Sequence, residues 1–114
     1  MKQFIKVMKA LSDENRVKIV KLLQHRVLCV CEIGEALSLA QSTTSKHLKI
    51  LEQADLITCS KEGQWTNYRL TDGENNPYAA SLLGNMRHWL KNDAAIEDLV
   101  KKLPDIRRET ICRL

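Results

Sequence analysis

Residues that interrupt regular secondary structure are scarce in this chain, which has only four Gly and two Pro among 114 residues. Gly and Pro are the strongest helix breakers, so their scarcity predicts a mainly α-helical fold. The stretch from Leu56 to Leu70 is the exception, because apolar and polar residues alternate there around Gly63. Alternation with a period of two is typical of strands, so this stretch predicts one β-hairpin.

The length and composition of the chain predict one small domain that spans residues 1–114. Its length is that of an ordinary single domain, and a hydrophobic content of 44% is sufficient for one core. The longest run without a charged residue has 12 residues, whereas a membrane-spanning helix needs about 20 apolar residues. The first residues contain no secretory signal. We therefore expect a cytoplasmic protein with no membrane partner.

Helical periodicity and capping residues predict four helices before the hairpin. We expect them at 2–10, from the cap Ser12-Asp13 to about 24–26, from Cys29 to Leu37, and from about 40 to 54.

After the hairpin, Asn75-Asn76-Pro77 is typical of a helix start, and Pro104 is expected to stop this last helical region. Asn92-Asp93 leaves open a separate terminal helix. The apolar positions of 75–103 predict a dimerisation region, because so small a domain gains stability by burying them against a second copy. Residues 105–114 are expected to form a loose tail.

The helix expected at 40–54 is polar and basic outside a narrow apolar stripe. A short helix, a tight turn and a helix with short polar side chains are what a helix-turn-helix uses to approach the major groove of DNA. The net charge of +4 agrees with a nucleic-acid partner but does not require one. We expect DNA contacts from Gln41, Ser42, Thr43, Ser45, Lys46, His47 and Lys49, and from Lys61, Gln64 and Arg69 of the hairpin as a wing.

Two other interpretations remain open at this point. Any one of these charged residues could be an ordinary solvated side chain, and a winged-helix domain could bind another protein instead of DNA. Catalysis is not expected, because the sequence contains no nucleophile–His–carboxylate grouping, glycine-rich phosphate loop or paired catalytic acids.

Three stretches, 12–23, 41–51 and 61–70, resemble the signature segments of the ArsR/SmtB family of winged helix-turn-helix repressors. The sequence Leu28-Cys29-Val30-Cys31-Glu32 resembles the metalloid box of the branch that senses arsenic, cadmium and lead. The resemblance implies a homodimer, built on the first and last helices, that leaves double-stranded operator DNA when a soft ion binds its thiolates.

The chain departs from the family pattern in ways that affect the ligand set. The arsenic branch often has a third Cys where this chain has Gly34, so a third ligand must come from elsewhere, and Cys112 is the candidate. Zinc-sensing members carry paired ligands on the last helix, of which His88 alone is present. We therefore do not expect that zinc site.

Thiolates prefer soft ions, which favours As(III) or Sb(III), and then Cd(II) or Pb(II), as the inducer at Cys29 and Cys31. No ion is expected to be needed for the fold itself. Cys29 and Cys31 are two positions apart, so on one helix their side chains would point about 200° away from each other. Binding both sulfurs to one ion is therefore expected to unwind the first turn of this helix.

The cysteines also have simpler interpretations. Cys29 fits a buried apolar position, whereas Cys31 lies on the polar side of the expected helix, and Cys59 is expected to pack in the core. A thiol redox or persulfide switch, with a disulfide such as Cys59–Cys112, is the alternative to ion sensing.

Overall fold

A computed structural model describes the backbone of residues 1–111 and the side chains of residues 1–109. Its elements are α1 (Lys2–Ala10), α2 (Glu14–Leu23), β1 (Leu28–Cys29), α3 (Val30–Leu37), α4 (Gln41–Gln53), β2 (Ile57–Glu62), β3 (Trp65–Leu70), α5 (Pro77–Met86), α6 (Ala94–Lys102), a 3-10 turn η1 (Leu103–Asp105) and α7 (Arg108–Ile111). This order confirms the expected fold, a winged helix-turn-helix. Within residues 1–111, none of the helices has both the length and the apolar character needed to cross a bilayer.

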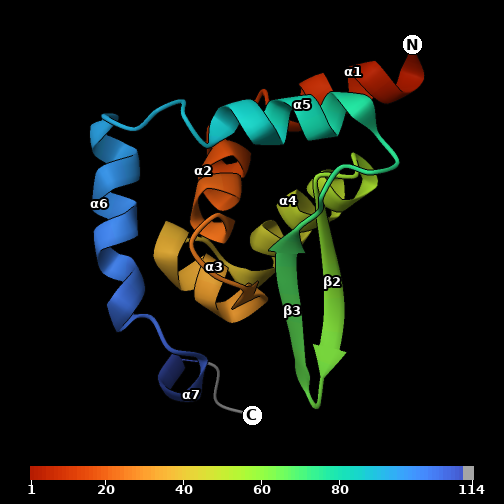
Figure 1. Ribbon diagram of the computed structural model, residues 1–114. Helices are drawn as coiled ribbons and strands as arrows, with labels where there is room; N and C mark the ends of the chain where they lie inside the picture. Colours follow the sequence, from red (N-terminus) through yellow and green to blue (C-terminus); the bar gives the residue numbers. More distant parts are fainter. Residues whose placement is uncertain (112–114) are drawn as a thin grey trace.

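The centre of the molecule is formed by α2, α3 and α4, which surround the apolar core (Figure 1). Helix α2 begins where expected, because the Asp13 carboxylate accepts a hydrogen bond of 3.1 Å from the Arg16 amide. Helix α3 ends at Leu37, and its C-cap Ser38 has a left-handed backbone with φ 56°. Fully buried side chains from these and neighbouring elements include Val7, Ile19, Leu22, Leu28, Ile33, Leu48, Leu51, Leu56 and Ile57.

The sheet has three antiparallel strands in the order β1-β3-β2. The hairpin β2–β3 is the predicted wing, with Cys59 opposite Tyr68 and Glu62 opposite Trp65. Strand β1 was not predicted from the sequence. Its two residues, Leu28 and Cys29, pair with Tyr68 and Asn67, so the segment before α3 is joined directly to the wing.

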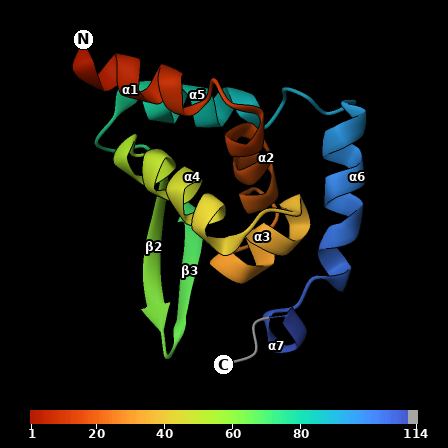
Figure 2. The ribbon, with the colours of Figure 1, turned by 180° about the vertical axis from the view of Figure 1, so that it is seen from behind.

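The C-terminal region 75–103 is divided into two helices with different packing. Helix α5 lies beside α1, whereas α6 runs beside α2 and α3 (Figures 1 and 2). The division is stabilised by Lys21, whose ammonium donates to the carbonyls of Met86 at 2.8 Å and Trp89 at 3.0 Å. Asp93 then caps α6 by accepting from the Ile96 amide. The separate terminal helix, one of the two alternatives, is therefore the one found.

The loose tail predicted for 105–114 is wrong for residues 105–109. Ile106 is buried, and Arg108 donates to Asn67 Oδ1 at 3.0 Å and to Glu62 Oε1 at 2.6 Å on the wing. The Arg108 guanidinium also lies 4.8 Å from the centre of the Trp65 ring. These contacts dock the segment from η1 to α7, which we call the C-terminal arm, against the wing. The last three residues of the predicted tail lie outside the described part of the chain.

Candidate DNA-binding surface and thiol site

Helix α4 presents a continuous exposed polar face. Its apolar side, Thr44, Leu48 and Leu51, is buried in the core. The helix begins at Gln41 without a side-chain cap, because Ala40 at the N-cap has no polar side chain. Six of the residues expected to contact DNA are exposed on this helix, namely Gln41, Ser42, Thr43, Ser45, Lys46 and Lys49.

His47 is the exception among the expected α4 residues, because it packs inward. Its side chain is only 15% exposed, and its Nδ1 lies 3.2 Å from Arg16 Nη1 and 4.0 Å from Asp13 Oδ1. Arg16 also donates through Nε to the Ala10 carbonyl at 2.7 Å. His47 thus takes part in a polar contact between α4, α2 and the end of α1. The expectation that His47 contacts DNA with the exposed residues of α4 is not supported.

Asp13 is the acidic member of this contact. Burial by itself would raise the pKa of its carboxyl, but the hydrogen bond from the Arg16 amide and the charges of Arg16 and His47 outweigh burial. The pKa of Asp13 therefore lies below its ordinary value, and the carboxylate stays ionised at neutral pH.

The wing presents its expected residues to solvent. Lys61 and Gln64 are exposed on either side of the tip, where Gly63 takes the positive φ of 63° that the tight turn requires. Arg69 is also exposed, and its Nη2 donates to Ser60 Oγ at 3.0 Å across the hairpin.

The Cys box is built differently from the expected helical turn. Cys29 lies outside α3, in an extended conformation at its N-cap, and is 1% exposed. Its amide donates to Glu32 Oε1 at 2.9 Å. The expected separation of 200° assumed that both cysteines lie on one helix, so that expectation is wrong. The deformation required to bring both sulfurs to one ion involves strand β1 as well as the first turn of α3.

Sequence reasoning missed the charged contacts that hold this segment. The Glu32 carboxylate is buried and also pairs with Arg26 Nη1 at 3.1 Å. Arg26 Nη2 donates to the Leu103 carbonyl at 3.2 Å and to the Ile106 carbonyl. The Cys box is therefore connected through Glu32 and Arg26 to the C-terminal arm. A Glu three residues after an N-cap could have indicated the first of these contacts, but nothing local indicates the second.

The thiols differ in environment and in oxidation state. Burial raises the pKa of the Cys29 thiol, and the Glu32 carboxylate adds to this. Cys31 is half-buried and is disulfide-bonded in this structure, whereas Cys29 and Cys59 carry free thiols. Cys112, the candidate third ligand, lies outside the described residues.

Cys59 is half-buried and not fully packed in the core, because its strand lies partly open to solvent. Its sulfur donates to Glu52 Oε2 at 3.4 Å. Burial and the Glu52 carboxylate both raise the pKa of this thiol. Because Cys59 is a free thiol, the Cys59–Cys112 disulfide of the redox alternative is not formed here.

Gly34 lies where α3 closely approaches the turn and α4. A Cβ at this position would lie 3.1 Å from the Leu39 carbonyl and 3.2 Å from Thr44 Oγ1. The absence of a side chain lets α3 approach the turn and α4 closely. Within the described residues, no three His, Cys, Asp or Glu side chains are grouped so that they could hold a metal ion.

A helix, a tight turn, a second helix with an exposed polar face and a β-hairpin wing define a winged helix-turn-helix DNA-binding domain. Residues 13–58 match the family described as bacterial regulatory protein, arsR family. The chain is 40% identical over 77 residues to an arsenical resistance operon repressor of Bacillus subtilis, covering 67% of this chain and 73% of that protein. It is 36% identical over 92 residues to the arsenic resistance transcriptional regulator ArsR1 of Pseudomonas putida, covering 77% and 72%. The chain belongs to the ArsR family of transcriptional regulators, which are not enzymes.

Solved structures agree with this assignment. HlyU from Vibrio cholerae is 26% identical and superposes with a TM-score of 0.65 over 77% of this chain and 91% of that one. A possible ArsR-family regulator from Mycobacterium bovis, whose winged helix-turn-helix domain is homodimeric in solution, is 29% identical with a TM-score of 0.65, covering 76% and 77%. Among the sequence relatives, a cadmium resistance transcriptional regulatory protein CadC homolog of Staphylococcus aureus is 40% identical over 68 residues, covering 59% of this chain and 56% of that protein.

Proposed function

We propose that this protein is a homodimeric repressor that releases its operator when a soft ion binds the Cys box. As(III) or Sb(III) is the proposed inducer, with Cd(II) or Pb(II) as the alternative. The arsenic and cadmium resistance regulators among its relatives support an inducer of this class. Soft ions also suit the thiol ligands that the chain offers.

The operator is bound by α4 and the wing. Ser42, Thr43 and Ser45 are short enough to bring the backbone of α4 close to the base edges, and the Gln41 amide can hydrogen-bond to a base. Lys46 and Lys49 neutralise phosphates and so contribute affinity that falls with salt. Lys61, Gln64 and Arg69 extend the contact from the wing.

The position of Cys29 is the main observation in favour of the proposed ion response. This residue is at once the N-cap of α3 and the partner of Asn67 in wing strand β3. Because its side chain is 1% exposed, a soft ion reaches the sulfur only when this segment opens. Ion binding therefore favours a state in which β1 has left the wing, and the population shifts toward it as the ion concentration rises.

The proposed ligands are Cys29, Cys31 in its reduced form, and Cys112 as the third. Three thiolates are a ligand set that soft ions prefer. Gly34 stands where the arsenic branch often has its third Cys, so we place the third ligand in another part of the chain.

The dimer is proposed to form through α1 and α5, the first helix and the start of the predicted dimerisation region. These two helices lie side by side and leave Phe4, Ile5, Met8 and Tyr78 between 37% and 40% exposed. An apolar face of this kind on so small a domain is suited to a second copy. Helix α6 packs on α2 and α3 and is not proposed as part of this face.

DNA-binding measurements test the proposal directly. Fluorescence anisotropy with DNA from upstream of the gene should show tight, salt-sensitive binding by the reduced protein, and arsenite should release it. Cys29→Ser and Cys31→Ser should bind DNA normally but remain bound with arsenite, because a hydroxyl is a poor soft-ion ligand. Cys59→Ser is the matched control and should still respond. DNA binding that As(III), Sb(III), Cd(II) and Pb(II) all leave unchanged would contradict the ion response.

A thiol redox or persulfide switch is the second candidate, favoured by the disulfide at Cys31. In that case oxidised protein without any ion would lose affinity for DNA, and a reductant would restore it. If oxidation releases the DNA and arsenite does not, the redox assignment replaces the ion assignment.

A further inference from the structure

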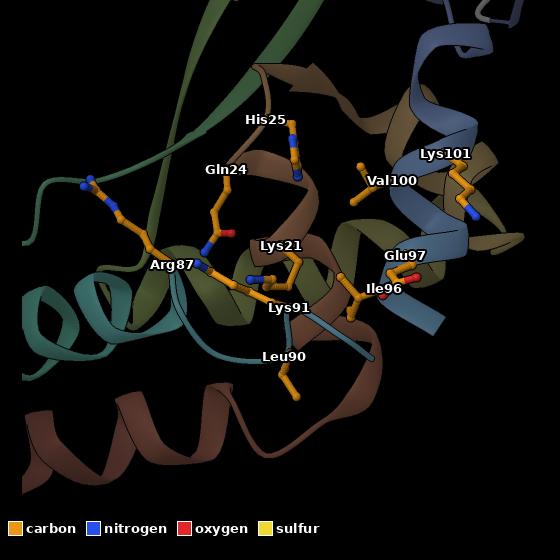
Figure 3. Close-up of a pocket in the computed structure, with 10 residues that line it drawn as sticks. All are labelled: Lys21, Gln24, His25, Arg87, Leu90, Lys91, Ile96, Glu97, Val100 and Lys101. Atoms are coloured by element: carbon orange, nitrogen blue, oxygen red, sulfur yellow. The ribbon is translucent and has the colours of Figure 1, made fainter. Parts of the chain in front are cut away.

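A cavity of about 450 Å³ lies between α2, the connection from α5 to α6, and α6 (Figure 3). This volume lies within the range of small-molecule binding sites. Part of its wall is apolar and is formed by Leu90, Ile96 and Val100. None of the residues proposed to bind DNA or a soft ion lines this cavity.

Lys21 brings an unneutralised charge to the cavity. Its side chain is 5% exposed, and its ammonium donates to the carbonyls of Met86 and Trp89. An ammonium has three hydrogens to donate, so these two bonds leave one. Within the described residues, Lys21 forms no ion pair with a carboxylate. A buried cation without a counter-ion is costly, which makes this position favourable for an anion.

Two further donors face the same part of the cavity. The Gln24 Nε2 atom is buried and has no hydrogen-bond partner. Figure 3 shows the nitrogen ends of Lys21, Gln24 and Lys91 directed toward one another. Burial lowers the pKa of Lys21, and the nearby charge of Lys91 lowers it further. Three donors therefore converge at one end of the cavity.

The remaining charges around the cavity are also mostly positive. Arg87 and Lys101 line it together with Lys21 and Lys91, against the single acidic residue Glu97. In Figure 3 the Glu97 carboxylate lies on the α6 side, away from the three converging donors. The cavity thus combines a cationic end with an apolar wall.

We infer that this cavity binds a small amphipathic carboxylate, such as a medium-chain fatty acid. The carboxylate accepts hydrogen bonds from Lys21, Gln24 and Lys91, and the hydrocarbon chain packs on Leu90, Ile96 and Val100. This site goes beyond the proposed function, because it uses neither the thiols nor the DNA-binding face. The negative charge of the carboxylate offsets the positive charge of the buried Lys21 ammonium. The hydrocarbon chain of the ligand covers the apolar wall and so removes apolar surface from water.

Isothermal titration of the full-length reduced protein with octanoate tests this inference. Octanoate should bind saturably, with one site per chain. Acetate, which lacks the chain, and 1-octanol, which lacks the charge, should each bind at least about tenfold more weakly. Equal affinity for acetate or for 1-octanol would overturn the assignment of an amphipathic anion.

A matched pair of lysine variants locates the site. Lys91→Gln removes an exposed member of the donor group, and should weaken octanoate binding about tenfold through loss of a charge-assisted hydrogen bond. Lys102→Gln changes the same charge on exposed α6 surface outside the cavity and should have no effect. Absence of saturable octanoate binding overturns the inference. This includes the case in which a second copy of the chain covers the cavity and so prevents binding. Octanoate affinity that Lys91→Gln leaves unchanged also overturns the inference.

Discussion

Asp13 connects three helices through one carboxylate. It caps α2 and lies beside Arg16, which reaches the end of α1, and beside His47 of α4. We expect Asp13→Ala to lower the free energy of unfolding by about 1 kcal/mol, measured by urea denaturation, because the cap is removed. Asp13→Asn keeps a capping oxygen and should have a smaller effect.

The same residue gives a pH prediction with a definite sign. The pKa of Asp13 is lower in the folded protein than its ordinary value near 3.8. Its ionised form therefore stabilises the fold above the unfolded pKa, and this stabilisation is lost as the pH falls through the folded pKa. From its value at pH 5, the difference in unfolding free energy between wild type and Asp13→Asn should shrink as the pH falls below about 4. A difference that grows below pH 4 would contradict it.

Glu32 has a larger role because it is buried between two donors, the Cys29 amide and Arg26. Glu32→Ala leaves both without this acceptor. Since the Arg26 side chain is 40% exposed and water can replace part of the interaction, we expect a loss of about 2 kcal/mol in urea denaturation. Glu35→Ala, on the exposed side of the same helix, is the matched control and should change stability by less than about 0.5 kcal/mol. Equal losses would contradict the assigned role of Glu32.

At the scale of single residues, local contacts were predictable and distant ones were not. The caps Asp13, Asn76 and Asp93 act on amides two or three residues away, so their spacing is visible in the sequence. Lys21 and Arg26 instead bind carbonyls 65 to 80 residues further along the chain. No periodicity indicates such a pairing, because it depends on how α6 and the C-terminal arm return to the core.

At the scale of the elements, the exposed side chains of α4 allow a direct test of operator recognition. Thr43→Ala with Ser45→Ala should weaken specific operator binding by about 1–3 kcal/mol for each hydrogen bond to a base that the substitutions remove. Both side chains are exposed, so the fold should be unaffected. Anisotropy with operator and with unrelated DNA separates the two effects, since only the operator complex should weaken. An equal reduction of affinity for both DNAs would assign these residues to phosphate binding instead.

The C-terminal arm is expected to restrain the wing. Arg108 holds Glu62, Asn67 and Trp65, which lie on both strands of the hairpin. Arg108→Ala should therefore increase amide hydrogen exchange over residues 62–67 while leaving that of α5 unchanged. Lys102→Ala, a nearby cation without these contacts, should leave the wing protected. Unchanged exchange in Arg108→Ala would show that the wing is held by strand pairing alone.

The elements themselves could be predicted to different degrees. Helices α1 to α4 and the hairpin follow from periodicity, because each has enough residues to show it. Strand β1 has two residues, too few for any period to be visible. The apolar spacing of 75–103 continues across the break after α5, so it could not distinguish one helix from two. The Asp93 cap was the local signal for the break.

At the scale of the whole molecule, the proposed dimer face, the Cys box and the wing occupy different positions. Helices α1 and α5 lie together at one end, and the tip of the wing points to the opposite end (Figures 1 and 2). The Cys box pairs with the middle of wing strand β3 through Leu28 and Cys29. A change at Cys29 can therefore reach the wing through one strand pairing while the proposed dimer face stays intact.

The dimer is tested by placing a charge on that face. Ile5 is 40% exposed on α1, so Ile5→Glu should fold but disfavour burial against a second copy. We expect sedimentation velocity to show a monomer and operator binding to weaken strongly. Val27 is similarly exposed, at 43%, but lies between α2 and β1. Val27→Glu should remain dimeric, and a monomer in both variants, or in neither, would contradict the assigned interface.

In the proposed mechanism, a soft ion captures Cys29 only by separating β1 from the wing. Hydrogen exchange of the reduced, DNA-free protein with and without arsenite measures this separation. We expect arsenite to accelerate exchange at residues 28–29 and 67–68 at least about tenfold, while the amides of α5 keep their protection. Arsenite that releases the operator but leaves exchange at 28–29 and 67–68 unchanged would contradict it.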